Sequence, residues 1–121
     1  MEITRADAVS AYEAPKHHAM MAFTLQGKDA TANEHFWVGL SLFLPRGGAE
    51  HAASATEKVY VVLAGEITIL TDEGEEFLGP MDSCRIAPGE ARTIENRSHD
   101  VVKMLVISAN AGPGKETGAV K

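Results

Sequence analysis

The sequence predicts a single all-β domain, and three observations support this fold class. Runs of strand-favouring residues recur at short intervals, and each run is bounded by turn-forming residues. No long stretch has the apolar spacing of a helix, apart from one or two short helical turns expected within residues 6–14. The chain has 121 residues, of which 45% are hydrophobic, and this is enough for one core. Many short strands with little helix indicate a sandwich or a barrel.

The turn-forming residues place the boundaries of the expected strands. The Pro-Arg-Gly-Gly sequence at 45–48 is predicted to end one strand, and Gly65 to form a tight corner. The Asp-Glu-Gly sequence at 72–74 predicts a hairpin. We expect a barrel domain over 1–108 and a mobile tail over 109–121, which is rich in glycine and alanine. The predicted strands are 20–26, 36–44, 58–63, 66–71, 75–78, 83–86, 92–95 and 101–108.

Composition excludes several classes of function. The net charge is −6 and the isoelectric point is about 5.3, so there is no basic surface for nucleic acid. No apolar run approaches the roughly 20 residues that span a bilayer. The N-terminal residues do not resemble a secretory signal, and we expect a cytoplasmic protein. The single cysteine, Cys84, excludes an internal disulfide and a thiolate zinc site.

Two segments resemble the cupin family. Residues 57–66 read Glu-Lys-Val-Tyr-Val-Val-Leu-Ala-Gly-Glu, which is similar to the family's E-x-x-Y-V-L-x-G-E strand and corner. Residues 78–89, followed by Ile-Glu-Asn at 94–96, resemble its G-D-x-x-x-I-P-x-G-x-x-H-x-x-x-N segment. The resemblance implies a double-stranded β-helix, a small jelly-roll barrel whose mouth holds the active site. It also implies a homodimer formed by packing or exchanging the N-terminal strand within 16–26.

In that family, three histidines and one glutamate bind Fe, Mn, Ni, Cu or Zn inside the barrel. A gapless alignment places Ala52 and Ser54 at the first two histidine positions, Lys58 at the glutamate and Arg92 at the last histidine. This register keeps none of the four ligands. The guanidinium of Arg92 cannot bind a metal cation and would repel it. The register therefore predicts a barrel without the family's metal, and hence no cofactor.

A register shifted by one residue has different consequences. It places His51 and Glu57 at two ligand positions, and one of His17, His18 or His35 would have to complete a site with two histidines and one carboxylate. Because successive strand residues point to opposite faces, only one register can be correct. The gapless register turns Lys58 inward, and the shifted one turns Glu57 inward.

Two interpretations of the cationic replacements are left open. In one, Arg92 pairs with an acid and locks the barrel, the candidate acids being Glu57, Glu90 and Glu95. In the other, Lys58 and Arg92 form a pocket for a small anionic or carboxylate molecule.

Several side chains are candidates for ligand binding and chemistry. The predicted ligand-binding residues are Ala52, Ser54, Lys58, Arg92 and Trp37. Trp37 and its neighbour Phe36 point to opposite faces, so one of them packs in the core and the other lines the cavity or a dimer contact. The catalytic candidates are Lys58 as a base or Schiff-base nucleophile, Tyr60 as a proton donor, and Arg92.

Three functional hypotheses follow from these patterns. The first is a metal-free barrel that holds a small anion and has isomerase, dehydratase or lyase activity. The second is a metal-dependent dioxygenase, decarboxylase or isomerase that uses His51 and Glu57. The third is a structural or regulatory homodimer with a sealed barrel. The absence of paired histidines counts against the second, and the first differs from the third only in the open barrel end that the family resemblance implies.

Overall fold

The computed structural model describes residues 1–111 and has almost no helix. Its elements are η1 (Ala6–Ala8), β1 (His17–Gln26), β2 (Phe36–Ala52), β3 (Lys58–Ala64), β4 (Ile67–Thr71), β5 (Gly74–Leu78), β6 (Ser83–Ile86), β7 (Arg92–Glu95) and β8 (Val102–Ala109). All eight predicted strands are present, and the predicted all-β barrel is confirmed. The described residues contain no helix long and apolar enough to cross a membrane.

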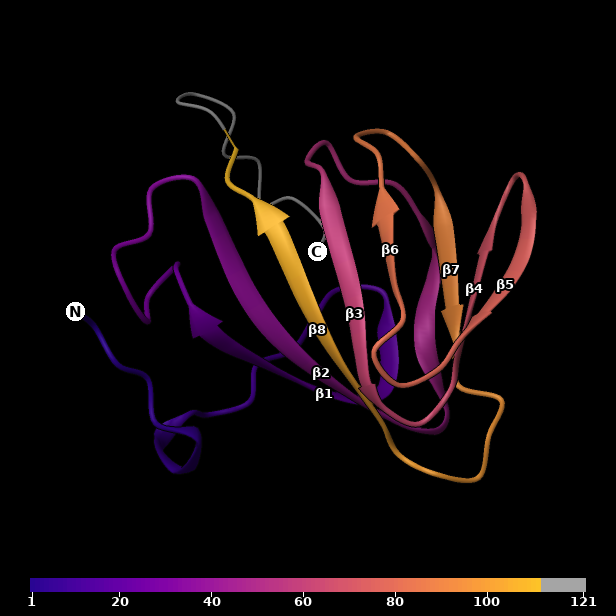
Figure 1. Ribbon diagram of the computed structural model, residues 1–121, viewed down its shortest axis with the longest axis horizontal. Coiled ribbons are helices and arrows are strands. Elements are labelled where there is room, and N and C mark those ends of the chain that lie inside the picture. The colour runs from indigo at the N-terminus through magenta and orange to yellow at the C-terminus, as the bar shows by residue number, and fades with distance from the viewer. Residues whose placement is uncertain (112–121) are drawn as a thin grey trace.

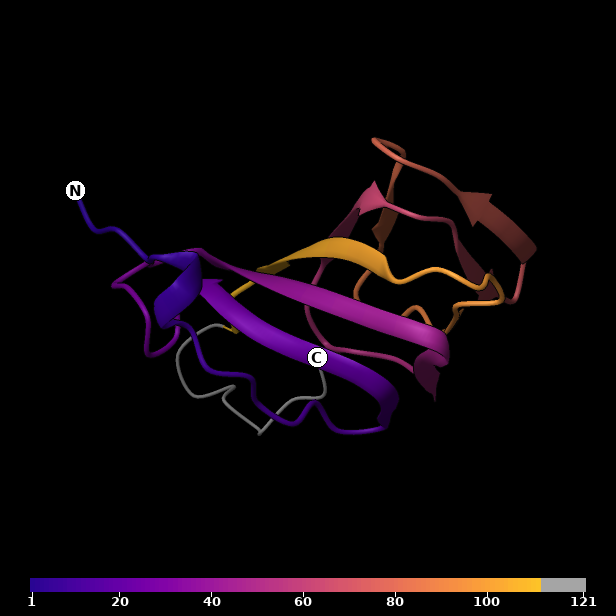
Figure 2. The same cartoon turned by 90° about the horizontal axis from the view of Figure 1, so that it is seen from below.

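The strands form one antiparallel sheet that curls into a nearly closed barrel (Figure 1). Its order is β5-β4-β7-β2-β8-β3-β6, and β1 pairs with β2 in addition. Figure 2 shows β1 running along β2 at one side of the molecule. Because β1 pairs within its own chain, the structure has a packed N-terminal strand; the homodimer stays a prediction.

Strand β2 is longer than the sequence predicted. The expected stop at 45–48 is wrong, because β2 continues from Phe36 to Ala52. The reason is the close approach of neighbouring backbones. A Cβ atom on Gly47 would lie 2.0 Å from the carbonyl oxygen of Ala19, and one on Gly48 would lie 2.0 Å from that of Ile94. The two glycines therefore let the strand continue between its partners, where any side chain would collide with them.

The end of β8 also differs from the prediction. Ala109 belongs to this strand, and the backbone N–H of Asn110 donates to the carbonyl of His35 at 2.9 Å. The tail predicted over 109–121 thus overlaps the last strand, and residues 112–121 of it lie outside the described part of the chain.

Alternation along the strands builds the barrel interior. Strand β3 alternates buried and less buried positions from Lys58 to Val62, and β8 does the same from Val102 to Ser108. The largest fully buried apolar side chains are Phe43, Tyr60, Val62, Ile67, Ile94, Val102 and Met104. This core leaves a group of polar side chains at one end of the barrel.

Candidate functional site

Three predicted site residues meet inside the barrel. Lys58 and Tyr60 lie on the inward face of β3 and are 3% and 2% exposed, while Arg92 begins β7 and is 4% exposed. Glu57 lies on the outside, where its carboxylate accepts a hydrogen bond from Nε of the exposed Arg85. The burial pattern of β3 is therefore that of the gapless register.

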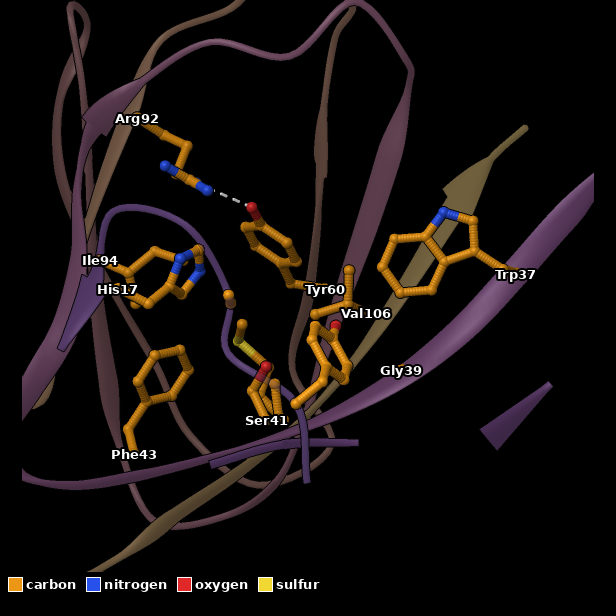
Figure 3. Close-up of a pocket in the computed structure, with 13 residues that line it drawn as sticks. His17, Trp37, Gly39, Ser41, Phe43, Tyr60, Arg92, Ile94 and Val106 are labelled. Atoms are coloured by element: carbon orange, nitrogen blue, oxygen red, sulfur yellow. Dashed lines mark hydrogen bonds between the residues drawn. The ribbon is translucent and has the colours of Figure 1, made fainter. Parts of the chain in front are cut away.

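Arg92 and Tyr60 are joined directly (Figure 3). Nε of Arg92 donates to the Tyr60 hydroxyl at 2.9 Å, and Nη1 donates to the backbone carbonyl of Glu50 at 3.1 Å. Burial raises the pKa of Tyr60, although the charge and hydrogen bond of Arg92 oppose this shift. Tyr60 is therefore a neutral phenol at pH 7, and its hydroxyl is oriented by a permanent cation.

Lys58 lies beside this pair. Its Nζ donates to the hydroxyl of Ser108 at 3.2 Å and stands 5.8 Å from the centre of the Trp37 ring. Burial, followed by the charges of Arg92 and Lys28, lowers the pKa of Lys58 from 10.5 to about 8. The amine is thus mostly protonated at pH 7 but gives up its proton far more readily than a surface lysine.

Two cavities share Tyr60 and Arg92 in their walls. The inner one has about 370 Å³ of empty space, counting the part open to solvent, and Trp37 and Phe43 belong to its mainly apolar lining. The second lies at the rim and has about 210 Å³ by the same measure. Its lining includes Ala52, Ser54, Lys58 and Arg92, which are the four positions of the gapless register, together with Glu90. Every predicted ligand-binding residue thus lines one of these two cavities, whereas the sealed-barrel hypothesis predicted no pocket.

The segment before β1 forms part of the inner wall. Tyr12, Ala14 and His17 line the inner cavity, and Figure 3 shows His17 on the same side as Arg92. Burial lowers the pKa of His17; its backbone hydrogen bond to Pro15 opposes this, and the charges of Arg92, His18 and Lys58 add to it. No local pattern indicated a role for Tyr12, because its position depends on a bridge to Ala22 in β1.

The shifted register, which needs His51 and Glu57 to point into the barrel, does not agree with the structure. His51 is exposed on the outside of β2, where its Nδ1 lies 3.1 Å from Oγ1 of Thr93. His18 and His35 are exposed as well, so His17 is the one candidate histidine that lines either of the two cavities described above. Within residues 1–111 no three His, Cys, Asp or Glu side chains come close enough to hold a metal ion. Since the four family positions offer Ala52, Ser54, Lys58 and Arg92, the residues present do not fit the family's metal.

Each of the acids considered as partners of Arg92 has another described partner. Glu57 pairs with Arg85, and Glu95 pairs with Arg97 at 2.7 Å on the surface. Oε1 of Glu90 accepts a hydrogen bond of 2.9 Å from the backbone N–H of Ala87. The described bonds of Arg92 include those to the neutral oxygens of Tyr60 and Glu50, and the interpretation of a barrel locked by one of these acids stays a prediction.

Sequence reasoning missed two residues beside Lys58. Ser108 is 1% exposed and accepts the bond from Nζ, and Thr56 bonds to Ser108 through its hydroxyl at 3.1 Å. The alternation of β8 indicated that Ser108 is buried. Nothing local indicated that it faces Lys58, because that depends on the register between β3 and β8.

The fold and the site together define a small antiparallel jelly-roll barrel with a buried cationic group beside an apolar cavity. The chain matches no known family model. It is 44% identical over 110 residues to a protein of Mycobacterium tuberculosis named beta-D-galactosidase, and the aligned region covers 91% of this chain and 95% of that protein.

Solved structures resemble the barrel at low sequence identity. The polyketide cyclase RemF from Streptomyces resistomycificus has a TM-score of 0.82 at 18% identity, over 100% of this chain and 84% of that chain. An RmlC-like cupin from Shewanella frigidimarina has a TM-score of 0.76 at 13% identity, over 93% and 94% of the two chains. A predicted oxalate decarboxylase from Thermotoga maritima has a TM-score of 0.76 at 16% identity, over 92% and 100%. These structures show that the chain has the cupin fold. Its identity to the Mycobacterium tuberculosis protein, over nearly the whole of both chains, shows that the two belong to one family.

Proposed function

We propose that this cupin binds and hydrolyses a β-D-galactoside at the group formed by Lys58, Tyr60 and Arg92. One observation carries the proposal. The relative named beta-D-galactosidase is 44% identical to this chain, and the match covers nearly the whole of both proteins. Similarity of this extent favours a shared pocket as well as a shared fold.

The side chains around the cavities suit a sugar. Trp37 and Tyr60 offer aromatic surface for the apolar face of a pyranose or furanose ring. Arg92 and Lys58 are hydrogen-bond donors for sugar oxygens, and both line the rim cavity with Ser54. Aromatic walls with a few fixed polar groups are typical of small-molecule sites.

Glycoside hydrolysis needs a proton for the leaving oxygen and a base for the attacking water. Most glycosidases use two carboxyl groups for this. Among the residues lining the two cavities, Glu90 is the one carboxylate, and the rim cavity holds it together with Lys58. We assign Lys58 as the general acid, because its pKa of about 8 leaves it protonated yet acidic near neutral pH.

With these roles, every bond and proton of the hydrolysis is accounted for. The bond between the anomeric carbon and the leaving oxygen breaks, and that oxygen takes the proton of Lys58. Water adds to the anomeric carbon and gives its proton to Glu90. Arg92 and the Tyr60 hydroxyl that it orients hold the sugar in place.

A chromogenic β-D-galactoside tests the proposal, with the α-anomer as the substrate control. Lys58→Met and Glu90→Gln should each lower kcat by roughly 10²–10⁴, the usual contribution of a general acid or base. Glu57→Gln is the matched control, because Glu57 precedes Lys58 in the chain but its carboxylate lies on the outside. Wild-type protein that is folded by circular dichroism yet hydrolyses neither anomer would contradict the proposal.

A second candidate is a small carboxylate ligand, and the two buried cations favour it. A guanidinium binds a carboxylate through two parallel hydrogen bonds, and the ammonium of Lys58 adds a second charge. Calorimetric titration with D-galacturonate and with D-galactose separates this candidate from the first. Tighter binding of the acid, lost in Arg92→Ala, would support it, whereas equal affinity of the wild type and the variant for the acid would reject it.

A further inference from the structure

A row of three hydroxyl groups connects Lys58 with the rim of the barrel. Nζ of Lys58 donates to Oγ of Ser108 at 3.2 Å, and Oγ of Ser108 lies 3.1 Å from Oγ1 of Thr56. Oγ1 of Thr56 then lies 3.1 Å from Oγ of Ser54. The row starts at two buried side chains, Lys58 and Ser108, and ends at a half-buried one, Ser54, which lines the rim cavity.

The sheet and the loop before β3 hold this row together. Ser108 stands opposite Lys58 in the pairing of β8 with β3. The backbone N–H of Ala109 donates to the carbonyl of Glu57 at 3.0 Å, which ties the loop to β8. The backbone N–H of Thr56 donates to Oγ of Ser54 at 3.2 Å and so fixes the last hydroxyl. Backbone hydrogen bonds therefore hold Lys58 and Ser108 opposite each other and keep Thr56 and Ser54 close to them.

The chemistry of the groups sets the direction of the bonds. A lysine ammonium only donates, so the Ser108 hydroxyl accepts at one end. Ser54 already accepts from the backbone N–H of Thr56. The hydroxyl hydrogens can therefore all point outward, from Ser108 to Thr56, from Thr56 to Ser54, and from Ser54 to solvent or a ligand. The carbonyl of Ala109 competes for the hydrogen of Ser108, but at the longer distance of 3.3 Å.

A buried general acid must regain its proton after each turnover. Lys58 is 3% exposed, and a substrate in the rim cavity would cover what little of its side chain meets water. We propose that Ser108, Thr56 and Ser54 form a proton relay between Lys58 and the solvent. The inference rests on the general-acid role given to Lys58 under Proposed function.

The relay conserves protons at every step. Once Lys58 has given up its proton, its neutral amine accepts a hydrogen bond from Ser108, and the three hydroxyls turn so that each donates inward. Water at the rim then gives a proton to Ser54, which passes its own to Thr56; Thr56 passes its own to Ser108, and Ser108 passes its own to Nζ. Each hydroxyl gains one proton and gives one away. The net change is the transfer of one proton from solvent to Lys58, and the donor directions of the row are reversed.

Exchange of the Lys58 ammonium hydrogens with water tests the relay without any substrate. The signal is followed by NMR on ¹⁵N-labelled protein and assigned by its absence in Lys58→Met. Thr56→Val keeps the shape of the side chain, removes the middle hydroxyl and leaves the direct partner of Lys58 in place. Exchange should slow by roughly fivefold, the factor that one ordinary hydrogen bond represents. Thr56→Ser, which keeps the hydroxyl, should restore it.

The outcomes separate the relay from the proposed hydrolysis. If exchange is equally fast in the wild type and in Thr56→Val, there is no relay, whatever the activity. If exchange slows but the wild type hydrolyses no galactoside, the relay stands and the proposed function fails. If Thr56→Val does not fold, Ser54→Ala removes the outer end of the row and should slow exchange in the same way.

Discussion

Nε of Arg92 donates a hydrogen bond of 2.9 Å to the hydroxyl of Tyr60, so a permanent cation and a phenol meet inside the barrel. In the gapless alignment with the cupin motif, Arg92 stands at a histidine position, and Tyr60 stands two residues after the glutamate position. The pair belongs to the walls of both cavities. Loss of the bond between Arg92 and Tyr60 should therefore affect both the stability of the barrel and the shape of the two cavities.

Tyr60→Phe should destabilise the protein by about 1.5–3 kcal/mol, the range for hydrogen bonds to charged groups. The ring stays in the core, so the loss reflects the removed hydroxyl and the desolvated guanidinium of Arg92 that it leaves behind. Urea unfolding followed by circular dichroism measures the change. A midpoint equal to that of the wild type would mean that the bond contributes nothing.

His51→Ala and Glu57→Gln should each change stability by less than about 1 kcal/mol, as is typical for exposed polar contacts. Both side chains face outward, His51 against Thr93 and Glu57 against Arg85. The same variants test the shifted register. Protein incubated with Fe, Mn, Ni, Cu or Zn should retain no stoichiometric metal by elemental analysis. A bound metal that is lost in His51→Ala would contradict the gapless register.

Asn96→Ala should cost about 3 kcal/mol or more, because it removes a buried amide that donates to three backbone carbonyls. Asn96 is 1% exposed, and its Nδ2 donates to the carbonyls of Phe43, Leu44 and Asp100 at 2.8–3.1 Å. Ser98→Ala is the matched control, because it removes one donor to Oδ1 and keeps the three amide bonds. Thermal unfolding compares the two variants, and equal losses would contradict a central role for the amide.

The fold was accessible from the sequence because its signals are local. Period-two alternation marked the strands, and the segment from Glu57 to Glu66 resembled a known strand and corner. The same alternation fixed which face of β3 carries Lys58 once the register was chosen. The inward position of Lys58 in the structure agrees with the gapless alignment.

The rest could not be predicted because it depends on contacts between distant segments. The glycines at 47–48 resemble a turn until Ala19 and Ile94 are placed against them. Ser108 is an ordinary buried strand residue until β8 pairs with β3 and brings it to Lys58. Alternation gives the face of each strand, but it does not give the partner across the sheet.

The pH dependence of stability provides the most direct test of the environment of Lys58. Its folded pKa of about 8 lies below its ordinary value of 10.5. Between these values the unfolded chain binds more protons than the folded protein, so the free energy of unfolding should rise as pH increases from about 8 to 10.5. The shift corresponds to a gain on the order of 3 kcal/mol. Below pH 8 both states are protonated, and the full cost of burying the charge is present.

Other groups titrate in the same range, so the comparison with Lys58→Met isolates the effect. Burial raises the pKa of Tyr60 and of Cys84, and these shifts make stability fall as pH rises. Both shifts are present in the wild type and in Lys58→Met, so they cancel when the free energies of unfolding of the two proteins are subtracted. Urea unfolding at several pH values should show the variant gaining stability over the wild type at pH 7 and losing that advantage towards pH 10. A difference that stays constant with pH would mean that Lys58 titrates like a surface lysine, and its assignment as a general acid near neutral pH would then be wrong.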